Sequence, residues 1–283
     1  MKGKSVAIRI TTLSENTAER GDFLGEWGLS ILVETDDVTV LLDTGKTSSA
    51  AYNADSLGVD LNKIDRVVLS HGHYDHTGGL RELLRRMRKK VEVTAHTDVW
   101  QQKYARREGE PDRYIGIPFQ RDELESMGAS FRISSQPVHI AKGVMTTGEI
   151  PMVTEFEHID KALFVKEGSV WRPDKLTDDQ ALIVKTEQGL TVLLGCAHRG
   201  MINTLYHARH VAGHEKIYTV IGGSHLVGAS EERLWQTIAA LRELGVERLG
   251  LCHCTGLPVA SALAQEFGER FFFNKAGSVV ESP

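Results

Sequence analysis

This sequence has few cysteines, no long apolar run and no excess of positive charge. No apolar run reaches the roughly 20 residues that a membrane-spanning helix requires, so we expect no membrane association. The formal net charge is −5, which argues against a protein that binds nucleic acid by bulk electrostatic attraction. Three cysteines are too few for a disulfide framework and fit a reducing compartment most simply.

Two further signals are missing. Residues 1–10 form a short basic lead into a strand without the apolar core of a signal peptide, so we expect a cytoplasmic protein. No segment matches G-x-G-x-x-G or a P-loop, and nucleotide-cofactor binding therefore gains no support. The 283 residues and 41% hydrophobic content are those of an ordinary globular chain with a sizeable core.

Alternating strand and helix patterns predict a layered α/β protein. Leu80, Leu83, Leu84 and Met87 follow the i, i+3, i+4, i+7 spacing of an amphipathic helix. Each half of the chain runs from hairpin strands into alternating strands and helices, which predicts two sheets between outer helices. The predicted strands are residues 5–12, 29–34, 38–42, 66–70, 91–94, 180–186, 190–194, 216–221 and 248–251; the predicted helices are residues 48–57, 80–87, 203–212, 231–244 and 258–267.

The pattern is weaker over residues 96–174. Short helical stretches at 98–107 and 121–127 alternate there with strand-like pieces at 130–133, 144–147 and 162–165. A loose segment of this length in an enzyme-like chain is usually an insertion or a lid. We expect it to shape a substrate pocket, with its aromatic side chains either stacking on a ring or covering the core: Trp100, Tyr104, Tyr114 and Phe119.

The strongest signal is a cluster of metal-capable side chains after the predicted strand 66–70. His71 and His73 alternate in an extended segment and can face one side, while Asp75 and His76 lie where the chain turns into a helix. Imidazole with carboxylate suits zinc, iron or manganese better than calcium, which prefers oxygen ligands throughout. The glycines around the cluster leave room for turns and close backbone approach. The segment therefore predicts a metal site.

Other clusters of polar residues have simpler explanations. The cations on the helix 80–87 and just after it favour a solvated face, with an anionic, phosphate-bearing substrate as the functional alternative. His207, His210 and His214 have helical spacing, which favours a solvated face over a metal site. Cys252 and Cys254 lack the C-x₂₋₄-C spacing of structural zinc sites. The cations are Arg81, Arg85, Arg86, Arg88, Lys89 and Lys90.

The motif His71-x-His73-x-Asp75-His76 at a strand end resembles the signature of the metallo-β-lactamase superfamily. The hairpin of residues 30–42, which ends at Asp43, resembles the motif that precedes it. Segments 195–200, 222–226 and 252–256 are similar to one branch, whose members are metal-dependent hydrolases or 7,8-dihydropterin-6-yl-methyl-4-(β-D-ribofuranosyl)aminobenzene 5'-phosphate synthases. The resemblance covers most of the chain.

This resemblance implies a fold and a ligand set. The fold would be one domain, residues 1–283, built as a four-layer αββα sandwich with two metal ions in a cleft at the edge of the sheets. His71 and His73 would bind the first ion, Asp75 and His76 the second, and His253 would complete the second site.

The chain departs from the superfamily pattern at two places. Cys196 stands where relatives commonly have a bridging aspartate, and Asp178 and Asp179 stand where a histidine-containing motif is expected. His198, two residues beyond Cys196, is our candidate for the missing ligand of the first ion, against an ordinary loop histidine. Cys196 and Asp43 are candidates for further ligands or for residues that support them.

The functional expectations follow from these residues. We expect a hydrolase in which two divalent ions, zinc first and manganese or iron otherwise, activate a water against a small ester, lactone or phosphodiester. Asp75 would orient that water, and His225, after the strand 216–221, would be a catalytic residue if it faces the cleft. The alternatives are a synthase that joins a dihydropterin to a ribofuranosylaminobenzene phosphate, and a non-catalytic binding or redox module on the same fold.

Overall fold

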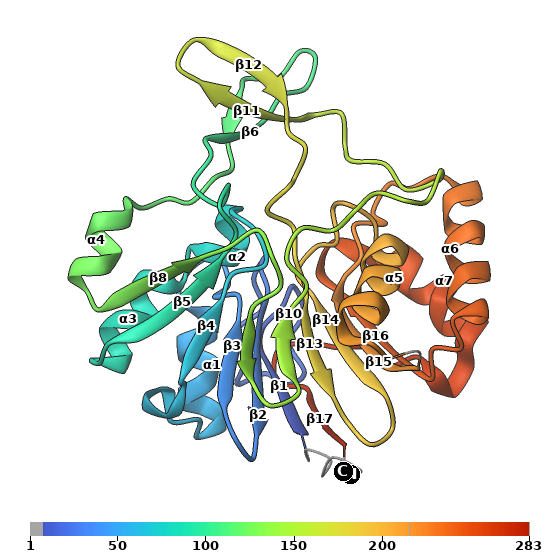
Figure 1. Ribbon diagram of the computed structural model, residues 1–283, viewed down its shortest axis with the longest axis horizontal. Coiled ribbons are helices and arrows are strands. Elements are labelled where there is room, and N and C mark those ends of the chain that lie inside the picture. The colour runs from blue at the N-terminus through green and yellow to red at the C-terminus, as the bar shows by residue number, and fades with distance from the viewer. Residues whose placement is uncertain (1–7, 215, 283) are drawn as a thin grey trace.

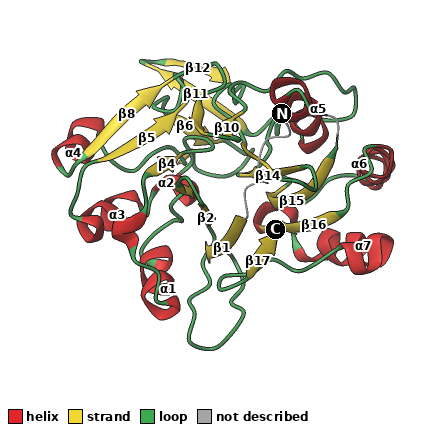
Figure 2. Cartoon of the chain, turned by 60° about the horizontal axis from the view of Figure 1, so that its bottom comes forward, coloured by secondary structure: helices red, strands yellow, loops and turns green. Residues whose placement is uncertain are grey.

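The computed structural model describes residues 8–214 and 216–282 and contains two large β-sheets packed face to face (Figure 1). Helices cover the outer face of each sheet, so the layers run helix, sheet, sheet, helix (Figure 2). This arrangement confirms the predicted αββα fold. The first three residues of the predicted strand 5–12 lie outside the described residues.

The first large sheet has seven strands in the order β17-β1-β2-β3-β4-β5-β8. β1 pairs antiparallel with β2 and β17, β2 is antiparallel to β3, and β3, β4, β5 and β8 run parallel. The strands are β1 (Ile8–Ser14), β2 (Ser30–Thr35), β3 (Thr39–Leu42), β4 (Arg66–Val68), β5 (Val91–Ala95), β8 (Ala129–Ile133) and β17 (Val279–Ser282).

The second large sheet has six strands in the order β16-β15-β14-β13-β10-β9. β14, β15 and β16 run parallel, and the other neighbouring pairs are antiparallel. The strands are β9 (His139–Ala141), β10 (Val144–Thr146), β13 (Leu182–Lys185), β14 (Leu190–Leu194), β15 (Ile217–Gly223) and β16 (Arg248–Cys252). Residues 96–174 therefore supply β8, β9 and β10 to the large sheets.

The helices bury their apolar sides on the sheets. The predicted stripe Leu80, Leu83, Leu84 and Met87 is fully buried between its helix and the first sheet. The first outer layer is α1 (Ser49–Leu57), α3 (Leu80–Met87) and α4 (Arg121–Ser126); the second is α5 (Met201–Ala212), α6 (Glu231–Glu243) and α7 (Leu257–Phe267). The short helices are η1 (Leu61–Lys63), α2 (Tyr74–Thr77), η2 (His253–Thr255) and η3 (Gly268–Arg270).

A third apolar layer joins the two sheets. Val33 and Val40 of the first sheet pack with Leu182, Val184 and Leu193 of the second, and all five are buried. Alternate residues of the same strands, such as Leu32 and Leu41, point instead to the helices. The central strands are therefore apolar on both faces, which explains their near-continuous hydrophobic runs.

A separate four-stranded sheet, the small sheet, stands beyond one end of the two large sheets (Figure 1). Its order is β12-β11-β6-β7, from β6 (Lys103–Ala105), β7 (Arg113–Tyr114), β11 (Leu163–Glu167) and β12 (Val170–Pro173). The predicted helix 98–107 is therefore wrong. Lys103–Ala105 pairs with Leu163–Val165 some 60 residues later, a contact that a local pattern does not contain.

No helix in the described residues combines the length and the apolar character needed to cross a membrane.

Candidate metal centre

Strands of both large sheets end at one rim, and the metal-capable side chains stand just beyond those ends. The His71–His76 segment follows β4, and α2 carries its last two metal-capable residues. In Figure 1 this short helix lies at the upper end of the first sheet, below the small sheet. Loops after strand ends are where open α/β sheets place their ligand sites. Further residues at this rim are Glu15 and Asn16 after β1, Asp43 after β3, Cys196 and His198 after β14, His225 after β15 and His253 at the end of β16.

Three imidazoles form a first ligand group. His71 Nε2 lies 3.0 Å from His73 Nδ1 and 3.2 Å from His198 Nε2, and all three residues are buried. Burial and the neighbouring cationic groups hold the pKa of each ring well below its usual value. The rings are therefore neutral at pH 7, which is the form that binds metal ions.

Asp75, His76 and His253 form a second ligand group. His76 Nε2 lies 3.2 Å from His253 Nε2, and the latter lies 3.5 Å from Asp75 Oδ2. Burial acts to raise the pKa of Asp75, but His76 and His253 outweigh it and hold the pKa well below its usual value. This carboxyl group is therefore ionised throughout the neutral range.

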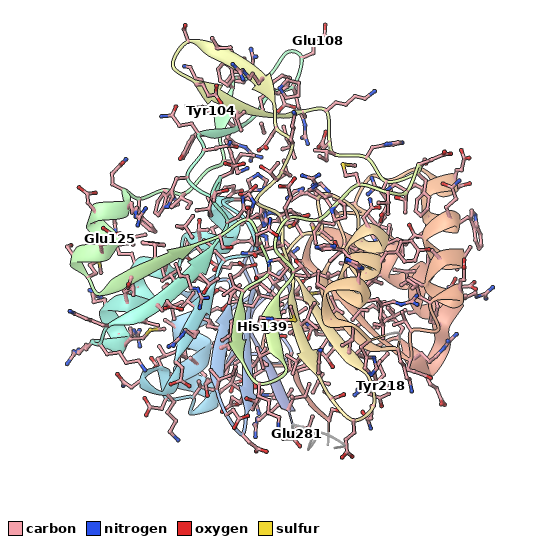
Figure 3. The ribbon with its side chains drawn as sticks, viewed as in Figure 1. Tyr104, Glu108, Glu125, His139, Tyr218 and Glu281 are labelled. Atoms are coloured by element: carbon pink, nitrogen blue, oxygen red, sulfur yellow. The ribbon has the colours of Figure 1, made fainter. Side chains whose placement is uncertain are left out.

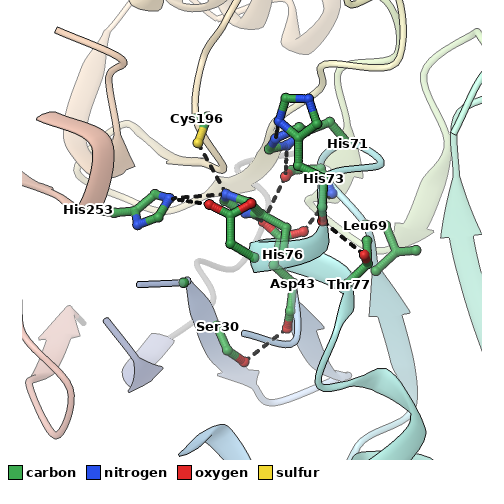
Figure 4. A network of polar contacts seen from close by, with 12 residues as sticks. Ser30, Asp43, Leu69, His71, His73, His76, Thr77, Cys196 and His253 are labelled. Carbon is green, nitrogen blue, oxygen red and sulfur yellow. Dashed lines mark hydrogen bonds and ion pairs between the residues drawn. The ribbon is translucent and has the colours of Figure 1, made fainter. Parts of the chain in front are cut away.

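Cys196 lies between the two groups. Its Sγ is 3.1 Å from His76 Nε2, and it groups with His71 and His76 on one side and with His253 and Cys254 on the other (Figure 4). Burial raises the pKa of the Cys196 thiol. The preceding Gly195 packs directly against Ser70, where any added Cβ would collide with the serine side chain. Glycine there lets the Cys196 loop approach the histidine segment.

Asp43 contacts the Nδ1 side of the His76 ring, and His76 is the one member of the two ligand groups to which its carboxylate is hydrogen-bonded. Its Oδ2 is 2.7 Å from His76 Nδ1 and from Ser70 Oγ, and its Oδ1 accepts the Ser70 N–H at 2.7 Å. Burial would lower the pKa of His76, but the carboxylates of Asp43 and Asp75 raise it to about 9. The site therefore attracts positive charge, either a proton or a metal ion.

Glu15 and Asn16 support His253 in the same way. Asn16 Oδ1 lies 2.9 Å from His253 Nδ1, and Glu15 Oε1 accepts the His253 backbone N–H at 2.8 Å. Sequence reasoning missed both residues. Their only local signal is that two polar residues directly follow a buried strand, and they lie more than 230 residues from their partner.

These supporting contacts decide which ring nitrogens carry protons. The Asp43 carboxylate only accepts, so His76 Nδ1 donates and leaves Nε2 bare in the neutral ring. Asn16 Nδ2 donates to the His253 carbonyl, so Asn16 Oδ1 faces His253 Nδ1. Because this amide oxygen only accepts, His253 Nδ1 carries the proton and Nε2 is bare in the neutral ring. Two lone pairs 3.2 Å apart beside a carboxylate repel unless a proton or a metal ion lies between them, and the raised pKa of His76 shows that this position holds positive charge. The residues present therefore fit a divalent metal ion.

Asp178 and Asp179 are buried but belong to neither ligand group. Asp178 Oδ2 accepts the Gly72 N–H at 2.8 Å, and its Oδ1 lies 2.8 Å from Lys103 Nζ. Asp179 Oδ2 accepts the Arg199 N–H at 2.8 Å, next to His198. The two aspartates thus hold the backbone on either side of the first ligand group.

The backbone around the ligands is strained at several points. Asp43, Ala197, His225 and His253 all have left-handed φ values, between 47° and 58°. Non-glycine residues rarely adopt this conformation, and each instance costs energy that the surrounding structure must offset. The strain is concentrated where loops turn side chains into the site.

A cavity of about 410 Å³, the site cavity, lies over both ligand groups. Its walls include His73, Asp75, Cys196, His198 and His253. His225 also lines it, with its ring centroid 4.2 Å from that of His198. The other wall residues are Trp27, Tyr74, Ala105, Arg107, Arg113, Ile115, Asp160, Leu163, Val227 and Cys254.

Comparison with known proteins agrees with this geometry. The family model described as the metallo-beta-lactamase superfamily matches residues 28–253. The chain belongs to this superfamily. The 7,8-dihydropterin-6-methyl-4-(beta-D-ribofuranosyl)-aminobenzene-5'-phosphate synthase of Methanocaldococcus jannaschii is 31% identical over 291 residues, covering 99% of this chain and 98% of that protein. An uncharacterized protein of the same organism is 30% identical, covering 96% of this chain and 99% of its own.

A solved superfamily structure extends the likeness to three dimensions. A metal-dependent hydrolase of the beta-lactamase superfamily matches with a TM-score of 0.84 at 31% identity, covering 97% of this chain and 99% of that one. The superfamily membership predicted from the histidine segment is thereby confirmed, as is the likeness to a branch that includes the synthase.

Several residues considered from sequence lie away from the two ligand groups and the site cavity. The cations of α3 pair on the outer layer with acids such as Glu82, Glu123 and Asp55. His207 contacts the Thr147 carbonyl oxygen. Trp100 and Phe119 pack on the core between the first sheet and its helices. Among the described residues, none of these lines the site cavity.

Proposed function

We propose that the chain is a metal-dependent hydrolase that acts on a small ester, lactone or phosphodiester. The observation that carries this proposal is a pair of buried three-residue ligand groups, each of which has two residues in the lining of the site cavity. We propose zinc as the metal, with manganese or iron as alternatives, because imidazole, carboxylate and thiolate suit these ions. The three free cysteines support a reducing cytoplasm.

The proposed mechanism assigns distinct tasks to the residues that line the cavity. Two bound ions would supply a water of lowered pKa and stabilise negative charge that develops on the substrate. Asp75, held as a carboxylate by its lowered pKa, orients the attacking water. His225, whose ring packs against that of His198, contacts the substrate oxygen on which negative charge develops. The small sheet contributes Ala105, Arg113 and Leu163 to the wall of the cavity.

A second candidate function is the synthase reaction. The full-length relative at 31% identity carries the name of a synthase, which favours bond formation between a dihydropterin and a ribofuranosylaminobenzene phosphate. Both reactions would use the same ligand groups. Incubating the chain with the two precursors separates them, because the synthase forms the conjugate and a hydrolase leaves the precursors unjoined.

Metal content tests the shared basis of both candidates. We expect elemental analysis to find about two ions per chain in the wild type and a loss of metal in a His73→Ala, Asp75→Ala double variant that stays folded. A chain that retains no metal after reloading with zinc, manganese or iron would support a binding module instead.

Asp75→Asn tests the catalytic assignment. The amide keeps the shape of the side chain but loses the negative charge that orients the water and helps to hold the second ion, so we expect the hydrolysis rate to fall about a hundredfold or more while circular dichroism stays unchanged. Asp37→Asn in an exposed turn is the matched control and leaves the rate unaltered. A wild-type rate in Asp75→Asn would exclude the assigned role.

A further inference from the structure

The inner face of the small sheet carries a row of residues over the site cavity. Arg113 on β7 pairs in register with Ala105 on β6, and Ala105 pairs with Leu163 on β11. All three line the cavity. Tyr104 and Tyr114 alternate with them and pack together with ring centroids 5.2 Å apart. These rings therefore face away from the cavity, and Figure 3 labels Tyr104 on the small sheet.

Backbone hydrogen bonds fix this row relative to the second ligand group. The Tyr74 N–H donates to the Ile115 carbonyl at 2.9 Å, and Tyr74 directly precedes Asp75. The Ile115 N–H donates in turn to the Lys103 carbonyl at 2.9 Å. Arg113, two residues before Ile115, is thus anchored to the segment that supplies Asp75.

The two arginines that line the cavity have few carboxylate partners in the protein. Within the part of the chain that the structure describes, no carboxylate lies within 4.0 Å of the Arg113 guanidinium. Arg107 reaches only Asp160, at 4.0 Å and with both side chains partly exposed. Arg106, beside them in sequence, is instead satisfied by Asp112 at 2.8 Å and by stacking on Trp171. The two cavity-lining arginines therefore remain available to a ligand.

Two aromatic side chains line the same cavity as these arginines. Trp27 is 47% exposed, lines the cavity, and packs its ring on His253 with centroids 5.1 Å apart. Tyr74, half-buried on the same cavity wall, has Lys46 over its ring at 5.5 Å. A molecule that fills the cavity would contact these rings, which favour a flat apolar body.

We propose that Arg107 and Arg113 bind a phosphate group of the substrate, while its reacting bond lies over the two ligand groups. This inference rests on the proposed function, because it names the substrate class of the same site. Two guanidinium groups offer planar, paired N–H donors that match the oxygens of a phosphate. The phosphate would replace Asp160 as the partner of Arg107, and the flat part of the substrate would lie against Trp27 and Tyr74.

Binding of phenyl phosphate tests the proposal without requiring turnover. The zinc-loaded chain is titrated calorimetrically with phenyl phosphate, and the dissociation constant is compared among wild type, Arg113→Gln and the Arg107→Gln, Arg113→Gln double variant. Each charged hydrogen bond lost should weaken binding by about tenfold or more. Arg172→Gln, an exposed arginine of the same sheet that faces Glu167, is the matched control and should change binding less than twofold.

The remaining outcomes are decisive in either direction. Equal binding by wild type and both arginine variants would overturn the proposal, as would an equal loss in Arg172→Gln, since that reports bulk charge. Benzoate and phenol are titrated in parallel, and arginine-dependent binding of benzoate with none of phenyl phosphate would overturn the choice of phosphate. Arginine-dependent binding of phenyl phosphate in a chain that hydrolyses no ester would sustain this inference and refute the proposed function.

Kinetics provide an independent readout if hydrolysis is found. For 4-acetoxyphenyl phosphate, Arg113→Gln should raise KM about tenfold or more and leave kcat within twofold. For neutral phenyl acetate, the same variant should leave both constants unchanged. A loss of kcat on both esters would contradict the assignment, because it would mean that Arg113 supports the ligand groups rather than the substrate phosphate.

Discussion

Asp43 joins three groups with one carboxylate: the Ser70 amide, the Ser70 hydroxyl and the His76 ring. It is completely buried and has a φ of 58°, a conformation that asparagine tolerates better than most residues. Sequence reasoning left open whether Asp43 binds metal or supports a ligand. Its contacts favour support, because its oxygens are already used by Ser70 and His76.

Asp43→Asn should therefore weaken metal binding at the second ligand group. The amide lacks the negative charge that holds a proton on His76 Nδ1, so the ring loses its fixed orientation. Loss of such a supporting contact typically costs about 10–100-fold in affinity. Chelator competition measures the two binding constants. Asp37→Asn serves as the control, and an Asp43→Asn chain with wild-type affinity at both groups would disprove the supporting role.

Between elements, one buried ion network connects the small sheet to the histidine segment. Lys103 on β6 lies 2.9 Å from Asp174 Oδ2 and 2.8 Å from Asp178 Oδ1, with none of its surface exposed. Burial would lower the pKa of Lys103, but the two aspartates raise it. Since Asp178 also holds the Gly72 N–H, the position of β6 is tied to the turn between His71 and His73.

Lys103→Met should destabilise the chain strongly. It leaves two buried carboxylates without their cation, and breaking a buried pair in this way costs about 3–5 kcal/mol. Urea unfolding of the metal-free chain measures the change. Arg172→Met removes an exposed pair from the same sheet and should cost less than about 1 kcal/mol. A loss for Lys103→Met no larger than this control would show that the network carries little stability.

For the molecule as a whole, the buried Asp179 should make stability depend on pH. Burial raises its pKa to about 7, from an ordinary value of 3.8, although the Arg199 N–H acts to lower it. The folded chain therefore keeps a proton that the unfolded chain has lost. This stabilising contribution is complete below about pH 4 and disappears as the pH rises through 7.

Asp179→Asn should remove this dependence. A difference of about three between the folded and unfolded pKa values corresponds to roughly 4 kcal/mol, so the variant should gain up to that amount over wild type between pH 4 and pH 8. Unfolding of the metal-free chains across this range measures it. Parallel stability profiles for wild type and variant would contradict the raised pKa, and Asp37→Asn should follow the wild type.

Local pattern accounts for much of the fold and for the core of the site. The α3 stripe and the double-sided apolar strands were predictable because neighbouring residues carry their periodicity. The histidine segment was predictable because four metal-capable side chains fall within six residues. Its grouping with His198 and His253 came from a family resemblance, and the structure brings those residues together.

Other features depend on pairs of residues far apart in the sequence. Asn16 meets His253, and Lys103 meets Asp174 and Asp178, so no local window contains either interaction. The predicted helix 98–107 failed for the same reason, because pairing with β11 decides its structure. β17 was missed because its partner β1 lies at the opposite end of the described chain.

That pairing of β1 with β17 has a consequence for synthesis on the ribosome. Ile8 is opposite Ser282, so the outer edge of β1 stays uncovered until β17 has been synthesised. The first ligand group is complete once His198 has emerged, whereas the second needs His253, held by Asn16 from the other end of the chain. A nascent chain would therefore complete its first ligand group before its second.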